Sequence, residues 1–132
     1  MVLIDTSSWT QALRRKGDAD VRERVVQLVT ETEGAWCDIV RLELWNGARS
    51  RDDRNTLRKM EDELPTLAMT AEVWNAACNI GSYARAKGLN VPTSDLLVFA
   101  CAHVHGTGLE HNDQHFDRIG ALLGGSRMPE RR

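Results

Sequence analysis

Short apolar runs alternate along the chain with longer stretches whose apolar residues recur at helical spacing. Val2 to Ile4 and Ala35 to Cys37 predict two buried strands, and Thr107 to Glu110 predicts a last one. Helical spacing predicts helices over residues 6–13, 18–30, 38–49, 51–64, 70–87, 93–105 and 113–123. Because strands alternate with helices, we expect an α/β fold with a small central parallel sheet flanked by helices on both faces.

Local start and stop signals bound these helices. Thr6 to Ser8 are expected to cap the first helix, and Asp38 is a plausible N-cap of the third. Pro65 ends the charged helix before it, and the residues from there through Leu67 are expected to form a short link. The helix that starts at Thr93 is apolar on nearly every side, which places it in the interior.

Length and composition indicate a single domain. The chain has 132 residues, 42% of them hydrophobic, and we expect one domain over residues 1–123 with a loosely ordered tail over 124–132. Cys37, Cys78 and Cys101 lie among apolar neighbours and are expected to be reduced core thiols. No apolar run approaches the roughly 20 residues of a membrane span, and no leader pattern opens the chain, so we expect a cytoplasmic protein.

Four acidic residues lie next to or within apolar segments, where a charged side chain is unexpected. Asp5 ends the first apolar run, Asp113 follows the last one, Glu43 lies inside an apolar helical pattern, and Asp95 sits in the first turn of the apolar helix. Sites in parallel sheets form beyond the carboxyl ends of the strands. Ordinary alternatives exist: Asp95 could complement a helix dipole and Asp113 could be an N-cap. Glu43 has no basic residue three or four positions away, so its partner must come from elsewhere in the fold.

If these acids converge, their repulsion calls for a counter-ion. Hard divalent cations that keep part of their water shell, Mg²⁺ or Mn²⁺, suit a cluster of carboxylates, and their usual work in such sites is phosphoryl chemistry. Phosphodiester hydrolysis is therefore the leading reaction class. The formal net charge of -2 gives no global basic field, so any nucleic-acid site must be local.

Four segments in order, VLIDTSSW, RLELWNGAR, PTSDLLVFACA and LEHNDQHF, resemble the PIN domain, and most of all the VapC toxins of type II toxin–antitoxin modules. The resemblance runs from Val2 to about Leu123. It implies a PIN-like fold, a Mg²⁺-dependent endoribonuclease acting on RNA, inhibition by a VapB-like antitoxin, and a homodimer. It assigns metal binding and catalysis to the acidic quartet and a supporting role to two hydroxyl residues: Asp5, Glu43, Asp95 and Asp113, then Thr6 and Ser7.

The segment HNDQHF departs from this family pattern. Many relatives have a threonine where His111 stands and a second aspartate where His115 stands. His115 could bind metal, touch a phosphate or only fill space, and we expect a peripheral, supporting role. His103 and His105, two residues apart, face different sides of a helix, which disfavours a zinc site.

Several residues are candidates for contacts with RNA or with a partner. Arg14, Arg15 and Arg49 could bind phosphates and Trp45 could stack on a base, while solvated surface and core packing are the plain alternatives. Leu57 and Met60 are expected to be exposed for antitoxin contact, by similarity to VapC-like proteins.

Two other functions compete with the ribonuclease. A catalytically inactive PIN-fold module that binds RNA or protein is suggested only by His115 in place of an acid. A nuclease for DNA or flap structures is disfavoured because the chain lacks long insertions.

Overall fold

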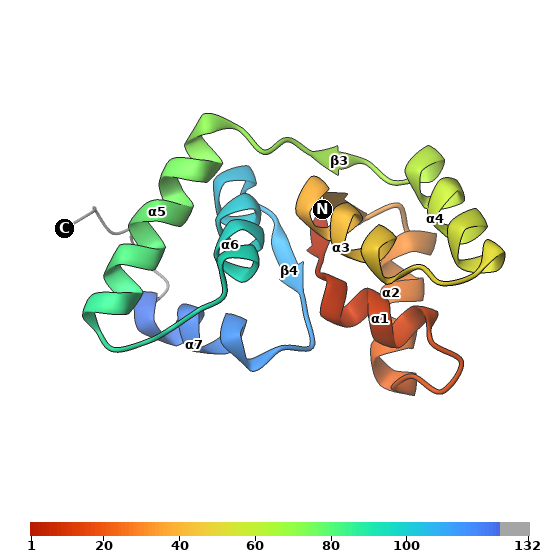
Figure 1. Ribbon diagram of the computed structural model, residues 1–132, viewed down its shortest axis with the longest axis horizontal. Coiled ribbons are helices and arrows are strands. Elements are labelled where there is room, and N and C mark those ends of the chain that lie inside the picture. The colour runs from red at the N-terminus through yellow and green to blue at the C-terminus, as the bar shows by residue number, and fades with distance from the viewer. Residues whose placement is uncertain (125–132) are drawn as a thin grey trace.

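The sheet at the centre of the molecule has four parallel strands. The computed structural model describes residues 1–124, so the tail predicted over 124–132 lies almost entirely outside the described residues. The strand order is β3-β2-β1-β4 (Figure 1). The strands are β1 Val2–Ile4, β2 Gly34–Cys37, β3 Thr66–Leu67 and β4 Gly108–Glu110.

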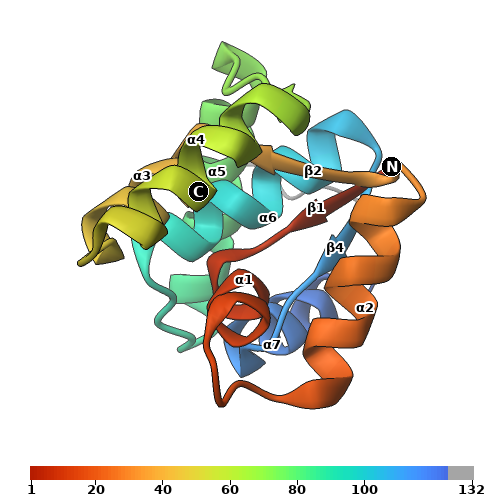
Figure 2. The same cartoon turned by 90° about the vertical axis from the view of Figure 1, so that its right-hand side faces the viewer.

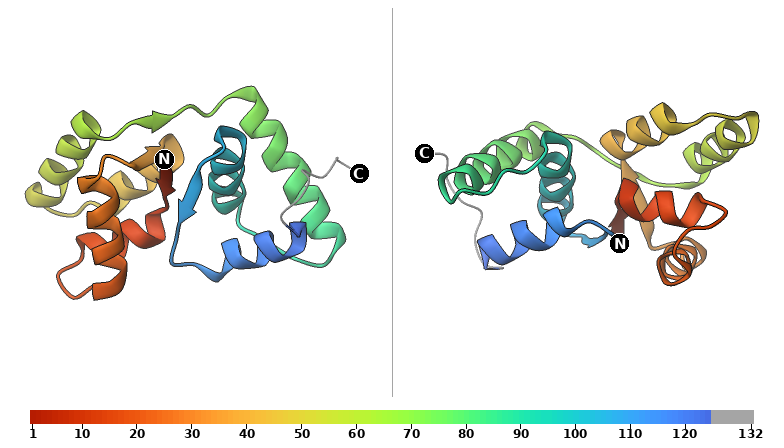
Figure 3. Two further views of the ribbon diagram at one scale, coloured as in Figure 1. Left: turned by 180° about the vertical axis from the view of Figure 1, so that it is seen from behind. Right: turned by 60° about the horizontal axis from the view of Figure 1, so that its bottom comes forward.

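Helices flank this sheet, as predicted. Helices α1 and α2 lie together on one side, and α5 and α6 lie on the opposite side, with α7 below α6 in Figure 1. Figure 2 shows α1 and α2 in front of the sheet, and the left view of Figure 3 shows α5 and α6 together from behind. The described helices are α1 Thr6–Leu13, α2 Ala19–Thr30, α3 Asp38–Gly47, α4 Arg51–Glu63, α5 Ala71–Ala86, α6 Thr93–His105 and α7 Gln114–Leu123.

The register of the sheet aligns the carboxyl ends of β1 and β4. Ile4 of β1 pairs with Glu110 of β4, and the backbone N–H of Asp5 donates to the carbonyl of Glu110 at 2.9 Å. The two loops that follow these strands therefore leave the sheet at the same level. Residues 5–8 and 111–115 become neighbours although about a hundred positions separate them in the chain.

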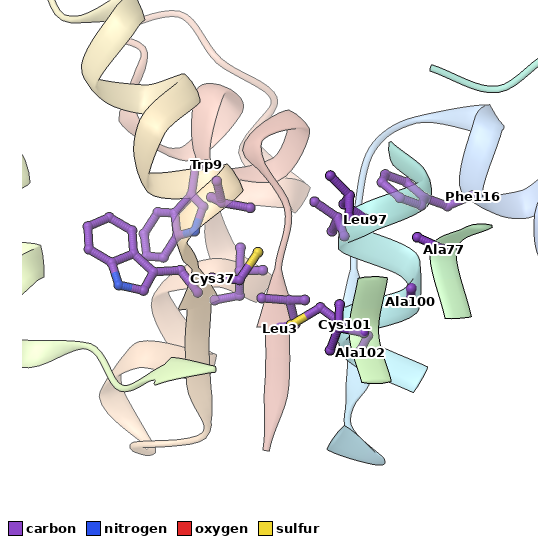
Figure 4. Packing of buried hydrophobic residues seen from close by; sticks show 14 of the residues in the cluster. Leu3, Trp9, Cys37, Ala77, Leu97, Ala100, Cys101, Ala102 and Phe116 are labelled. Atoms are coloured by element: carbon purple, nitrogen blue, oxygen red, sulfur yellow. The ribbon is translucent and has the colours of Figure 1, made fainter. Parts of the chain in front are cut away.

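The core surrounds the central strands. Leu3, Ile4, Trp36, Ile80 and Val98 are fully buried, and α6 is interior, as its apolar composition predicts. Figure 4 shows buried side chains of β1, β2 and α6 packed around the sheet. Cys37 and Cys101 are buried thiols, whereas Cys78 is exposed on α5, so the expectation of a third core thiol is wrong.

The predicted helix caps are partly wrong. Asp5 itself is the N-cap of α1, because its side chain accepts a hydrogen bond from the backbone N–H of Ser7. Asp38 is not an N-cap: Cys37 occupies that position without a side-chain hydrogen bond, and Asp38 begins α3 and pairs with Arg41 at 3.2 Å. The third helix also ends at Gly47, two residues earlier than predicted.

The segment after Pro65 is a strand where a link was expected. Thr66–Leu67 pairs with Trp36–Cys37, and the indole N–H of Trp36 donates to the Thr66 hydroxyl at 3.1 Å. Two residues are too short for an apolar alternation to be visible in the sequence.

The contact surface expected on α4 is wrong for its apolar residues. Leu57 and Met60 are only 3% and 8% exposed, because they pack into the core. Leu57 and Met60 are three residues apart, so both side chains lie on the inner face of an otherwise charged helix. Within residues 1–124, no helix is long and apolar enough to cross a membrane.

Candidate active site

Asp5 lies buried at the carboxyl end of β1, with only 4% of its surface exposed. Its Oδ2 accepts from the backbone N–H of Ser7 at 2.9 Å and from the Ser7 hydroxyl at 2.6 Å. The same hydroxyl accepts from the backbone N–H of Asn112 at 2.9 Å, which ties the loop after β4 to the first turn of α1. Ser7 therefore holds the Asp5 carboxylate and joins the two loops of the site.

Glu43 of α3 reaches the same edge of the sheet. Its Oε1 accepts a hydrogen bond from the Thr6 hydroxyl at 2.8 Å, across 37 positions of sequence. The expectation that its partner comes from elsewhere in the fold is confirmed, and that partner is a neutral hydroxyl.

Asp95 and Asp113 complete the cluster from two further segments. Asp95 lies in the first turn of α6. Asp113 is the N-cap of α7, and its side chain accepts a hydrogen bond from the backbone N–H of His115 at 2.9 Å. The N-cap alternative for Asp113 is thus confirmed, and the same residue also faces the acid cluster. A cap uses one carboxylate oxygen and leaves the group available for a second contact.

Mutual repulsion and burial oppose ionisation of these acids. The pKa of Asp95 is raised to about 6, first by burial and then by the charges of Asp113, Asp5 and Glu43. Burial likewise raises the pKa of Asp5 and of Glu43, although hydrogen bonds from Ser7 and Thr6 act in the opposite direction. Among residues 1–124 no lysine or arginine forms an ion pair with any of the four carboxylates, so no permanently charged base of the described chain offsets their ionisation.

His115 lies inside this cluster, although the role expected for it from the sequence is a peripheral one. Its Nδ1 is 3.0 Å from Asp95 Oδ2 and 3.0 Å from Asp113 Oδ1. One ligand atom from each of Asp95, Asp113 and His115 lies within 4.8 Å of the others, an arrangement able to hold a metal ion. Carboxylate oxygens and an imidazole nitrogen suit a divalent cation, so these residues fit the metal that the acid cluster calls for.

The comparison with family models identifies the chain. A model described as "PIN domain" matches residues 2–122. The chain belongs to the PIN domain family. The resemblance read from the four segments is therefore confirmed over nearly the whole chain.

Curated relatives of this PIN domain carry the name VapC. It is 32% identical to "Ribonuclease VapC18" of Mycobacterium tuberculosis over 125 residues, which cover 92% of this chain and 88% of that protein. It is 36% identical to "Ribonuclease VapC21" of the same species over 105 residues, which cover 77% of this chain and 76% of the relative. The identification as a PIN domain of VapC type thus agrees with both comparisons.

Solved structures share the fold. VapBC2 from Rickettsia felis, bound to a promoter DNA fragment, superposes with a TM-score of 0.74 at 20% identity and covers 90% of this chain and 93% of its own. FitAcB from Neisseria gonorrhoeae superposes with a TM-score of 0.72 at 20% identity, covering 92% and 94%. At this identity the likeness concerns the fold.

One residue of this PIN domain that the sequence reasoning missed is Glu110. Its carboxylate accepts from the buried Ser8 hydroxyl at 2.6 Å and from Arg24 Nε at 2.7 Å. The signal was available, since Glu110 ends an apolar strand just as Asp5 follows one. The pairing with Arg24 distinguishes Glu110 from the cluster, because its charge is compensated and joins α1, α2 and β4.

A groove of about 740 Å³ shares Thr6 and Glu43 with the acid cluster. Arg14, Arg15 and Lys16 also line it. The structure thus places two of the four RNA-binding candidates on a surface continuous with the site.

The other two RNA-binding candidates are placed differently. Trp45 is partly buried between α3 and α4, where its indole N–H donates to Glu61 at 3.2 Å and the Arg58 guanidinium lies 5.9 Å from its ring. Arg49 is exposed at the start of the α3–α4 connection and does not line the groove. Packing explains Trp45 without a base.

Proposed function

We propose that this PIN domain is a metal-dependent endoribonuclease that hydrolyses RNA phosphodiester bonds and acts as a VapC-type toxin. The observation that carries the proposal is the gathering of Asp5, Glu43, Asp95 and Asp113, from four separate segments, without a lysine or arginine partner among the described residues. Gathering four acids, one of them buried and three partly buried, lowers stability, so the cluster is better explained by a bound cation than by folding.

The four carboxylates are proposed to hold Mg²⁺, with Mn²⁺ as a substitute. When bound, the cation offsets negative charge on phosphate oxygens and lowers the pKa of water so that a nucleophile forms at neutral pH. The raised pKa of Asp95 is caused first by burial and then by the neighbouring carboxylates, and it supports this assignment because a bound cation would favour the ionised form against both causes.

The hydroxyl residues have a positioning role in this proposal. Ser7 holds Asp5, and Thr6 holds Glu43, each through one carboxylate oxygen. Fixed carboxylates need no rearrangement when charge develops on the substrate, which is the usual source of catalytic advantage in such sites.

The groove is proposed to carry the RNA strand up to the acids. Arg14, Arg15 and Lys16 supply positive charge beside Thr6 and Glu43, and phosphate contacts of this kind position a strand without reading its sequence. Arg49 is exposed outside the groove and is assigned no more than a general attraction for the backbone.

A VapB-like antitoxin is the proposed protein partner. Solved structures with this fold include VapBC2 from Rickettsia felis and VapBC-1 from nontypeable Haemophilus influenzae. We extend the partnership to this chain, together with a homodimeric state and a cytoplasmic location, where RNA substrates and an antitoxin would both be met.

The first test is cleavage of total RNA by the purified protein with Mg²⁺, with EDTA, and by the Asp5→Asn variant. We expect discrete fragments only from the wild type with Mg²⁺. A matched control is Asp38→Asn, because Asp38 also directly follows a strand but is exposed and paired with Arg41. That control should cleave normally, and cleavage by Asp5→Asn or in EDTA would contradict the proposal.

The alternative is a catalytically inactive PIN-fold module that binds RNA or protein. Only the replacement of an acid by His115 favours it. RNA binding without cleavage, together with no heat of divalent-ion binding in calorimetry, would support this alternative.

A further inference from the structure

His115 is more closely involved with the acids than a space-filling residue would be. It lies two positions after Asp113 in the first turn of α7, and its own backbone N–H donates to Asp113 Oδ1 at 2.9 Å. The ring Nδ1 then turns back to the same oxygen and to Asp95 Oδ2, both at 3.0 Å. The backbone hydrogen bond to Asp113 fixes the position of the His115 main chain, and from there the ring reaches the two carboxylates.

The Nδ1 atom has no satisfied hydrogen bond despite these short distances. It is buried from solvent and, among residues 1–124, no acceptor or donor meets hydrogen-bond geometry with it. A buried ring nitrogen without a hydrogen bond is unfavourable unless something else occupies its lone pair or shares its proton. The neighbours of this nitrogen are the carboxylates of Asp95 and Asp113, which cannot donate a hydrogen bond when they are ionised.

The spacing of the three groups suits shared coordination. Adjacent ligands of an octahedral ion with bonds of about 2.1 Å lie about 3 Å apart. Nδ1 has that separation from Asp95 Oδ2 and from Asp113 Oδ1. A protonated imidazole between two carboxylates would occupy the same place, and it is the competing arrangement.

We propose that His115 is a metal ligand through Nδ1, so that this site binds its cation with a nitrogen among the oxygens, which raises its affinity for Mn²⁺ relative to its affinity for Mg²⁺. The inference rests on the proposed function, in that it takes the acid cluster to bind a divalent cation. Imidazole suits transition metals, whereas Mg²⁺ prefers oxygen ligands and retained water. The nitrogen ligand thus shifts the relative affinity of the cluster toward Mn²⁺, while the carboxylates still accept Mg²⁺.

The deciding experiment is pulsed electron paramagnetic resonance of the protein loaded with Mn²⁺ alone. A directly bound imidazole gives a nitrogen-14 hyperfine coupling to Mn²⁺, and a merely structural histidine does not. We expect this coupling in the wild type, its loss in His115→Asp, and its retention in His111→Gln. His111 is the matched control because it lies just before α7, where its ring contacts Phe116 and Asp117 and its Nδ1 accepts from the backbone N–H of Asp113 at 3.4 Å, so that nitrogen already has a partner in the protein.

Calorimetry gives a second, independent result. The ratio of Mn²⁺ to Mg²⁺ affinity should fall by about tenfold in His115→Asp and stay unchanged in His111→Gln, because an oxygen donor replaces the nitrogen only in the first.

The outcomes separate this inference from the proposed function. Mn²⁺ bound by the wild type without nitrogen coupling would overturn the inference, since His115 would then serve only as a counter-charge, and would leave the proposed nuclease intact. No binding of either cation would overturn both. Absence of the coupling in the wild-type spectrum overturns the inference even if a variant fails to fold.

Discussion

Two groups of carboxylates on or near helix α3 differ in what accompanies them. Asp38 and Glu61 share the guanidinium of Arg41, at 3.2 and 2.9 Å, and Glu61 also accepts from Trp45. Among residues 1–124, Glu43, on the same helix as Arg41, has the Thr6 hydroxyl as its hydrogen-bond partner, and Asp5 and Asp95 lie close enough to act on it electrostatically.

The difference separates a structural role from a functional one. The Arg41 group is exposed and compensated, so it joins α3 to α4 at little cost. Within the described part of the chain the acid cluster has no lysine or arginine partner, and burial opposes its ionisation, so it lowers stability until a cation binds. The carboxylates with a structural role, Asp38 and Glu61, are paired with an arginine of the same fold.

The largest expected effect is on catalysis, and it uses this pair of glutamates. Glu43→Gln should lower the RNA cleavage rate by about 100-fold or more, because the loss of one metal ligand removes several kcal/mol of charge stabilisation. Glu61→Gln should leave the rate within about twofold, because its interactions are exposed. Single-turnover cleavage of a defined RNA measures both, and equal losses in the two variants would remove the distinction between the groups.

Cation binding should stabilise the acid cluster and leave the Arg41 group unaffected. Mg²⁺ or Mn²⁺ at 100 times its dissociation constant should stabilise the wild type by about 2.7 kcal/mol. Glu61→Gln should respond equally, and Glu43→Gln should respond much less. Thermal denaturation with and without EDTA measures the effect, and an unchanged melting temperature in the wild type would argue against a metal site.

The stability of the metal-free protein should depend on pH because ionisation of Asp95 is unfavourable in the folded state. Its pKa of about 6 in the folded state exceeds the ordinary value of 3.8, so the folded protein holds the proton more tightly and loses stability as pH rises from about 4 to 6. Asp95→Asn removes that loss. The variant should melt at a higher temperature than the wild type above pH 6, and the gain should shrink toward pH 4.

Differential scanning fluorimetry in EDTA across this pH range provides the measurement. Asp38→Asn serves as its control, since Asp38 is exposed. A constant difference between Asp95→Asn and the wild type at every pH would mean that titration of Asp95 is not the cause.

The smallest expected effect concerns the stability of the Arg41 group. Glu61→Gln should destabilise the protein by at most about 1 kcal/mol, because exposed ion pairs contribute little and are screened by salt. The small loss should shrink further in 1 M NaCl. Urea denaturation at two salt concentrations checks this, and a loss of several kcal/mol would show that α4 depends on Glu61 for its position.

Much of the architecture could be predicted because it is local. Apolar periodicity located all seven described helices and three of the four described strands, since burial of one face imposes that spacing on the chain. The strand over Thr66–Leu67 was missed because two residues carry no period. The burial of Leu57 and Met60 was missed because they are two apolar residues within a helix that is otherwise highly charged.

The candidate site was predicted in its members but not in its contacts. Asp5, Glu43, Asp95 and Asp113 each stood out locally, by a strand end, an apolar face or a helix start. Nothing local indicated that Ser7 joins Asp5 to Asn112, that Glu110 pairs with Arg24, or that His115 turns inward.

The sequence by itself determined which segments are buried and where charge interrupts them, because hydrophobic spacing and helix signals act over a few residues. Only the tertiary structure decided which interruptions meet. The parallel register of β1 and β4 brings Asp5 beside the loop that carries Asp113 and His115, and α3 and α6 deliver Glu43 and Asp95 to the same edge. Contacts across about a hundred residues depend on the register of the whole sheet, and a sheet register is a property of the assembled fold.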